Sequence, residues 1–105
     1  MDKHKPRITA QTLKVMGVLM SSQESELSGA DIARATKLQS GTLYPILLRL
    51  EQAKWLESHW ETSDPHDLGR PRRRYYRLTG LGARSARAAF RDVTSSIGIG
   101  GLAWQ

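Results

Sequence analysis

The sequence predicts a mainly α-helical fold with one β-hairpin, completed by a C-terminal helix. In the first half of the chain, apolar residues recur at helical spacing between polar breaks. Two stretches of alternating residues follow, at 55–61 and 72–78, and a turn-rich segment separates them. The last helical pattern covers residues 79–97. A chain of 105 residues is the size of one domain.

Two helices are expected first, and the second of them is short. Thr9 can cap a helix that runs to about Met20, because a side-chain oxygen there satisfies a free amide of the first turn. Ser28 can cap a second helix, with Asp31 near the positive end of its dipole. A four-residue turn at 36–39 then has the length that helix-turn-helix units use.

The third helix is expected to have Ser40 as its N-cap and to cover roughly residues 41–54. At 100° per residue, four aliphatic side chains share one face: Leu43, Ile46, Leu47 and Leu50. The opposite face is small and polar, with Gly41, Thr42, Pro45, Arg49 and Gln52. Pro45 is tolerated because amides in the first helical turns have few intrahelical partners. This polar face suits a close approach to a groove of DNA.

The hairpin is expected to form a basic wing. Alternation in 55–61 places Trp60 on the same face as Leu56, and both Trp55 and Trp60 are expected to pack in the core. Residues 62–71 form a loop, since they are rich in Ser, Asp, Pro and Gly. On the returning strand, the adjacent residues Tyr75 and Tyr76 fall on opposite faces, so one of them should face the core.

The C-terminal helix is expected to begin after Thr79, as its cap, and to carry a contact seam. Four apolar residues step by four, three and four positions, as in a coiled coil: Ala86, Phe90, Val93 and Ile97. Residues 98–105 are glycine-rich and are expected to lack regular structure. Residues 1–8 are expected to form a flexible basic arm.

Positive charge is concentrated in the second half of the chain. The net charge is +6, and eight arginines without any acidic residue lie between Arg70 and Arg91. This distribution favours nucleic acid or an anionic membrane surface as a partner. No apolar run is long enough for a transmembrane helix, and no signal-peptide core follows the charged N-terminus. The absence of cysteine excludes disulfides and thiolate metal sites, and it fits a cytoplasmic location.

Three segments, in this order, resemble the PadR family of bacterial transcriptional regulators. They are SGTLYPILLRLE at 40–51, WLES at 55–58 and GRPRRRYYRLT at 69–79. The likeness covers about residues 9–92 and implies a winged helix-turn-helix DNA-binding domain at 9–78 with a C-terminal dimerisation helix at 79–97. The short chain resembles the compact subfamily with a single C-terminal helix. The resemblance also implies a homodimeric repressor that a small molecule or another signal releases from DNA.

Two features depart from the family pattern. Leu48 occupies an exposed position of the third helix that is often polar in relatives. The C-terminal helix is short, since its pattern breaks at Gly98. The dimer contact is therefore expected to be smaller or to use the tail.

Candidate DNA contacts fall into three groups. The N-terminal part of the third helix would lie nearest the bases of the major groove, and its candidates are Ser40, Thr42, Tyr44, Pro45 and Arg49. Wing arginines can bind phosphates or enter a narrow minor groove, and the candidates there are Arg70, Arg72, Arg73 and Arg74. Flanking phosphate contacts are expected from Lys14, Arg34 and Lys37, and from Lys3, Lys5 and Arg7 of the arm. The opposing interpretation is that Tyr44 packs in the core and that the arginines are only solvated.

The C-terminal seam is expected to serve dimerisation through Ala86, Phe90, Val93 and Ile97. An effector pocket for a small hydrophobic or aromatic molecule would use Phe90, Val93 and Trp104, although dimer packing alone is the favoured explanation of the first two. No cofactor is expected, because Asp64, His66 and Asp67 match no metal signature. The sequence also shows no catalytic constellation, so an enzyme is not expected.

The leading hypothesis is a sequence-specific transcriptional regulator that binds a roughly palindromic operator as a homodimer and lies on the bacterial nucleoid when bound. Two alternatives stay open. Leu48 beside Tyr44 would suit a winged helix that docks into a groove of another protein. The arginine run alone would suffice for a sequence-tolerant architectural binder of DNA or RNA.

Overall fold

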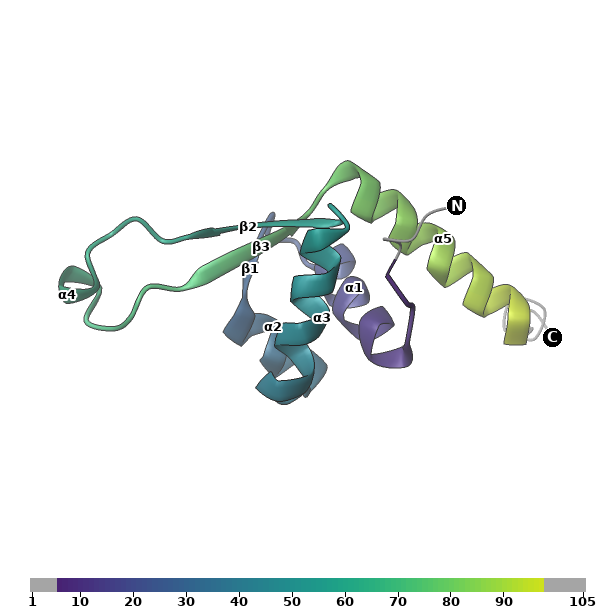
Figure 1. The fold of residues 1–105 in the computed structure, drawn as a ribbon, viewed down its shortest axis with the longest axis horizontal. Helices are drawn as coiled ribbons and strands as arrows, with labels where there is room; N and C mark the ends of the chain where they lie inside the picture. The colour runs from purple at the N-terminus through teal and green to yellow at the C-terminus, as the bar shows by residue number, and fades with distance from the viewer. Residues whose placement is uncertain (1–5, 98–105) are drawn as a thin grey trace.

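A computed structural model describes residues 6–97 and confirms the predicted fold class (Figure 1). The elements in chain order are α1 (Ala10–Ser21), β1 (Leu27–Ser28), α2 (Gly29–Thr36), α3 (Ser40–Gln52), β2 (Leu56–Trp60), α4 (Pro65–Leu68), β3 (Arg74–Leu78) and α5 (Gly80–Ile97). The first three helices form the body. The hairpin of β2 and β3 extends from one side of this body, and α5 runs along the other. Within the described range, no helix is long and apolar enough to cross a membrane.

The sheet has three strands in the order β1-β3-β2, and both pairings are antiparallel. The register places Leu56 opposite Leu78 and Trp60 opposite Arg74. The sequence pattern does not predict β1, which pairs Leu27 with Tyr76. A strand of two residues is too short to show alternation, and it exists only because β3 offers it a hydrogen-bonding edge.

The predicted caps of α1 and α2 are confirmed, and that of α3 is wrong. The Thr9 hydroxyl accepts a hydrogen bond from the Thr12 amide at 3.1 Å. Ser28 and Asp31 form a reciprocal capping box, with bonds of 3.1 and 3.2 Å. The N-cap of α3 is Gln39, which makes no side-chain cap bond, so Ser40 is the first residue inside the helix. The helix starts one residue earlier than predicted because the Gln39 carbonyl already accepts hydrogen bonds from the amides one turn later, at residues 42 and 43.

This difference between two serines predicts a difference in stability. Ser28→Ala removes one side of the capping box and should lower the free energy of unfolding by about 1 kcal/mol. Ser40→Ala is the matched control and should change it by less than about 0.5 kcal/mol. Urea denaturation followed by circular dichroism measures both. Equal losses for the two variants would contradict the assignment of the caps.

The core lies where α3 meets α1, α2 and the sheet. The predicted apolar face of α3 is buried, with Leu43, Ile46, Leu47 and Leu50 each at most 3% exposed. Trp55 and Tyr76 are buried as well, so the predictions of a core tryptophan and a core tyrosine are confirmed. Trp60 was expected to join them, but it is 54% exposed. The hairpin extends beyond the helices (Figure 1), and the sheet face that is buried at Leu56 is exposed at Trp60.

The C-terminal helix α5 packs on α1 within the same chain. The Thr79 hydroxyl accepts from the Gly82 amide at 2.9 Å, which confirms the predicted cap. Ala86, expected in the dimer seam, is fully buried in the chain's own core, and Phe90 packs against Gly17 of α1. Val93 is 37% exposed. The side chain of Ile97 and residues 98–105 lie outside the described part.

The arm differs from the expectation at its end. Pro6 is buried and Ile8 packs against the core, so residues 6–8 are held on the body rather than free. Arg7, between them, is exposed. Lys3 and Lys5, the other basic residues of the arm, lie outside the described residues.

Candidate nucleic-acid interface

The polar face of α3 is exposed along its length. Ser40, Thr42, Pro45 and Arg49 all lie on the surface, as predicted. Among residues 6–97, no hydrogen bond or ion pair engages the side chains of Thr42 or Arg49. Their donor groups are therefore available to a ligand on this face.

Tyr44 was predicted either to contact DNA or to pack in the core. Its side chain is 45% exposed, so it is not a core residue. Its hydroxyl reaches the start of α2, where a Cβ added at Gly29 would lie only 2.5 Å from it. A side chain at position 29 would therefore displace Tyr44, and glycine allows the two helices to approach each other.

The wing loop, residues 62–71, was expected to be irregular, but it contains the short helix α4. Asp64 caps α4 by accepting from the His66 amide at 2.8 Å, Pro65 provides the first helical residue, and Gly69 ends the helix with φ of 68°. Proline is favoured at that first position and glycine at that last one. Pattern reasoning assigned all of these residues to turns, because each of them also favours turns.

Glu61 holds the base of this loop together. It accepts two bonds from the Arg70 guanidinium, at 2.6 and 3.1 Å, and one from the Arg73 amide at 2.8 Å. These donors favour the charged carboxylate and lower its pKa from 4.5 to about 2. Because the folded pKa is depressed, the contact stabilises the wing above about pH 4.5 and is lost as pH falls towards 2.

Arg74 connects the wing to α3. Its guanidinium donates to the Glu51 carboxylate at 3.2 Å and to the Ser58 hydroxyl at 2.9 Å, and Ser58 donates to Glu51 at 2.8 Å. The same guanidinium lies 5.3 Å from the centre of the Trp60 ring, within the range of a cation–π contact. We call Glu51, Ser58 and Arg74 the Glu51 bridge.

The four predicted wing arginines therefore differ in role. Arg70 is held by Glu61, and Arg74 belongs to the Glu51 bridge. Arg72 donates through Nε to the Ser63 carbonyl at 2.8 Å, which leaves the rest of an exposed guanidinium available. Within residues 6–97, the exposed Arg73 makes no side-chain hydrogen bond or ion pair. The structure thus makes Arg72 and Arg73 the accessible cations of the wing.

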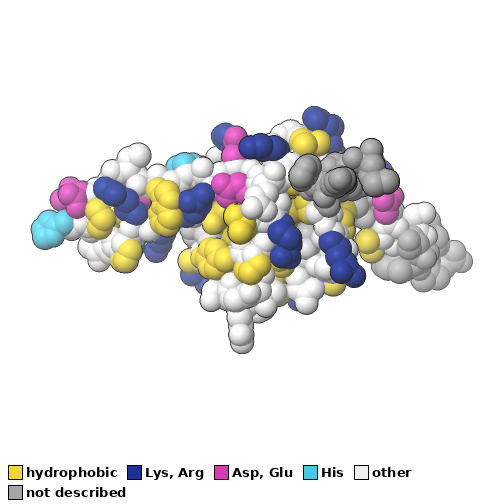
Figure 2. Space-filling view, viewed as in Figure 1, with side chains coloured by type: hydrophobic (Ala, Val, Ile, Leu, Met, Phe, Trp, Pro, Cys, Tyr) yellow, Lys and Arg dark blue, Asp and Glu magenta, His cyan; other side chains and the backbone are white. Residues whose placement is uncertain are grey.

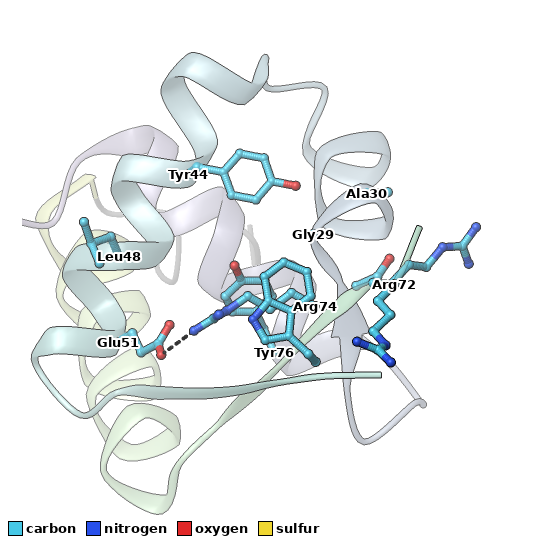
Figure 3. Close-up of a pocket in the computed structure, with 11 residues that line it drawn as sticks. Gly29, Ala30, Tyr44, Leu48, Glu51, Arg72, Arg74 and Tyr76 are labelled. Atoms are coloured by element: carbon cyan, nitrogen blue, oxygen red, sulfur yellow. Dashed lines mark hydrogen bonds and ion pairs between the residues drawn. The ribbon is translucent and has the colours of Figure 1, made fainter. Parts of the chain in front are cut away.

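A groove of about 680 Å³ separates α3 from the wing. Tyr44, Leu48 and Glu51 line it from α3, Trp60 lines it from β2, and the arginines at 72–74 line it from the other strand and its approach (Figure 3). Gly29 and Ala30, at the start of α2, line it as well. Figure 2 shows hydrophobic side chains gathered beneath the wing, with Lys and Arg side chains beside them.

Several residues that line this groove were not predicted as site residues, among them Trp60 and Glu51. Trp60 was assigned to the core, because alternation predicts on which face of the sheet a residue lies. It does not predict whether helices cover that face at its position. Glu51 was seen only as part of a motif. Its link to Arg74 spans 23 positions, and no local pattern carries that information.

The flanking candidates lie apart from the groove. Lys14 is exposed on α1, and Lys37 is exposed at the turn after α2, where it adopts φ of 64°. Arg34 pairs with Asp31 at 2.5 Å, although its side chain stays 72% exposed. None of these three side chains lines the groove.

A second cavity, of about 290 Å³, lies between the N-terminal segment and α5. Ile8 and Trp55 form one side, and residues of α5 that include Asp92 and Val93 form the other. Of the predicted effector-pocket residues, Val93 lines this cavity, whereas Phe90 packs against α1 and Trp104 lies outside the described part. No group of three or more potential metal ligands occurs in residues 6–97.

Comparison with known proteins identifies the family. The sequence matches the model of the transcriptional regulator PadR-like family over residues 14–88. Among curated protein sequences, none matches significantly.

Solved structures share the fold. A PadR family transcription regulator from Clostridium difficile superposes with a TM-score of 0.70 at 20% identity, over 92% of this chain and 100% of that one. Staphylococcus aureus MepR bound to DNA superposes with a TM-score of 0.64 at 24% identity, over 86% of this chain and 67% of that one. AbfR of Staphylococcus epidermidis gives 0.66 at 30% identity, over 85% of this chain but 55% of AbfR. In its DNA-binding conformation MepR gives 0.68 at 22% identity, over 93% of this chain and 66% of that one, just under two thirds of its length.

The family match extends over most of the chain, from α1 to α5, and includes α3 and the wing. It agrees with the observed order of helices and strands. This chain belongs to the PadR-like family of transcriptional regulators.

Proposed function

We propose that this protein represses transcription by binding a roughly palindromic DNA operator as a homodimer. The observation that carries the proposal is the exposed, unengaged polar face of α3 beside a wing with two accessible arginines, in a chain of the PadR-like family. The DNA complex of MepR, which has the same fold, supports it. The DNA-binding unit is residues 9–78, and the protein acts in the cytoplasm, on the nucleoid.

The wing and the polar face of α3 have separate roles. The wing supplies affinity for DNA, and α3 selects the sequence. Arg72 and Arg73 contact phosphates and give affinity that falls steeply with salt, because bound cations release counterions from DNA. Thr42 and Arg49 contact base edges in the major groove. Each good bidentate contact discriminates against a wrong base by about 1–3 kcal/mol.

The dimer forms through the seam face of α5 around Val93, in the unit 79–97. Among the seam residues whose side chains the structure describes, Val93 is the exposed one, and the cavity beside it is where a small hydrophobic or aromatic effector binds and alters the dimer. A dimer places two α3 helices in successive major grooves, about 34–36 Å apart. The operator should then contain two half-sites about one helical turn apart.

Selection of bound sequences from a random duplex pool, at near-physiological salt, tests this proposal. A palindromic consensus with half-sites one turn apart, together with a dimeric mass by sedimentation, is the expected result. Binding without any consensus would instead favour a sequence-tolerant architectural protein.

Leu48 favours a second candidate, a module that docks another protein. Its side chain is 57% exposed on the same face as Tyr44, and a large exposed apolar group is typical of interaction surfaces. Absence of DNA binding in the selection experiment, with tight binding to a protein partner, would support this candidate.

The role of Arg73 gives a direct prediction. Arg73→Ala should weaken binding to operator and random duplex alike, and it should reduce the slope of log affinity against log salt by about 0.9, the value of one phosphate contact. Arg87→Ala, which removes an exposed arginine of α5, is the control and should leave the slope unchanged. A loss confined to one operator sequence would show that Arg73 contacts a base instead.

A further inference from the structure

The groove between α3 and the wing has an unusual lining for a charged DNA-binding face. Six large hydrophobic side chains are exposed among the described residues, and three of them line this one groove. They are Tyr44, Leu48 and Trp60, which are 45%, 57% and 54% exposed. Tyr44 is a predicted DNA contact, whereas Leu48 and Trp60 have no role in the DNA binding proposed above.

The groove combines this apolar lining with a cationic rim. Arg72 and Arg73 supply the accessible positive charge. The one carboxylate that lines the groove belongs to Glu51, and Arg74 pairs with it at 3.2 Å. This pairing offsets a negative charge that would otherwise repel an anion in the groove.

The chemistry of a DNA strand matches this lining. A strand presents phosphates that alternate with the largely apolar faces of deoxyribose, so it can satisfy both the rim and the apolar side chains. Its path also fits. A protein that lays a helix in the major groove and a wing in the adjacent minor groove must straddle the backbone strand that separates the two grooves.

Trp60 is held in place for such a contact. The Arg74 guanidinium stacks on its ring at 5.3 Å from the ring centre, and Arg74 is itself fixed by the Glu51 bridge. The side chain nevertheless stays more than half exposed. An aromatic ring that is oriented but uncovered can pack against a sugar without a further loss of rotamer freedom.

We propose that one DNA strand passes through this groove and that Leu48 and Trp60 pack against its deoxyribose groups. The proposal rests on the DNA-binding function proposed above. It adds two contacts that carry no charge and read no base. They increase affinity for any duplex, and they contribute nothing to its dependence on salt.

A gain of charge tests the path of the strand without removing any packing. Leu48→Lys should place a cation beside a phosphate, raise affinity about fivefold near 0.15 M salt and steepen the salt dependence by about 0.9. Leu81→Lys is the matched control, because Leu81 is also an exposed leucine, 43% exposed, but lies on α5. It should change neither quantity. If Leu48→Lys behaves like Leu81→Lys, no strand passes through the groove and the proposal is wrong.

Removal of the apolar groups tests the sugar contacts. Trp60→Ala should weaken binding to operator and random duplex by a similar factor of about five, with an unchanged salt slope, since no charge is lost. Trp60→Phe keeps a ring and should retain most of the affinity. Unchanged affinity in Trp60→Ala, or a loss confined to one sequence, would overturn the proposed sugar contact.

The same measurements separate this proposal from the one on which it rests. If the unmodified protein binds no duplex, the proposed function fails. If it binds its operator while the Leu48 and Trp60 variants bind equally well, only the groove assignment fails.

Discussion

Gly82→Ala should destabilise the protein by about 3 kcal/mol or more, which is large for the addition of one methyl group. A Cβ at this position would lie 2.0 Å from the Trp55 carbonyl oxygen and 2.8 Å from its carbon. These are backbone atoms that cannot rotate away. The Trp55 amide donates to the Leu50 carbonyl at 2.9 Å, and its carbonyl accepts from the Thr79 amide at 3.0 Å. The first turn of α5 must therefore move off the junction of α3 and β2.

Gly80→Ala is the matched control for this prediction, because Gly80 belongs to the same helical turn. The nearest atom to its added Cβ is Nη1 of Arg84, at 3.4 Å, which is the end of a flexible side chain. Gly80→Ala should change the free energy of unfolding by less than about 0.5 kcal/mol. Urea denaturation followed by circular dichroism compares the two variants. If both denature at the same urea concentration as the unmodified protein, the close approach of α5 to Trp55 does not exist.

These two glycines illustrate what the sequence predicts and what it does not. Sequence reasoning located α5 and its Thr79 cap, because helical spacing and capping are local properties. It had no basis to separate Gly80 from Gly82, since the difference lies in the backbone of Trp55, 27 positions before Gly82. For the same reason β1 was missed, because only its pairing with β3 makes it a strand.

The candidate site shows the same limit. The concentration of arginines correctly identified a basic wing, but it did not reveal which arginines are already engaged. That depends on Glu61 for Arg70 and on Glu51 for Arg74, partners that lie 9 and 23 positions away. The α5 seam is a parallel case. Its spacing correctly predicts an apolar face. However, this face packs against α1 of the same chain, where Ala86 is fully buried without a second copy.

Arg74→Ala should weaken DNA binding by about tenfold or more, about 1.4 kcal/mol. Two effects act in the same direction. Glu51 would keep an unpaired carboxylate in a groove proposed for a DNA strand, and the wing would lose its link to α3. The Glu51 and Arg74 side chains are 31% and 35% exposed, so the pair should contribute more than an exposed surface pair does. Fluorescence anisotropy with an operator duplex measures the loss.

Arg77→Ala provides the control, since Arg77 also lies on β3 and pairs with a glutamate of β2, Glu57. The side chains of Arg77 and Glu57 are 57% and 54% exposed. Strand alternation places both on the sheet face opposite to α3. A pair of this kind contributes at most about 1 kcal/mol to stability. Arg77→Ala should therefore change operator affinity by less than about twofold.

A double-mutant cycle then decides whether Arg74 acts through Glu51 or touches DNA itself. If Arg74 acts through the bridge, Arg74→Ala should cost about tenfold in the unmodified protein but only about threefold in a Glu51→Gln background, because no carboxylate is left unpaired there. Equal costs in the two backgrounds would mean that Arg74 contacts a phosphate directly. In that case its removal should also lower the salt slope by about 0.9, as expected for Arg73. The cycle thus distinguishes an arginine that positions the wing from one that binds DNA.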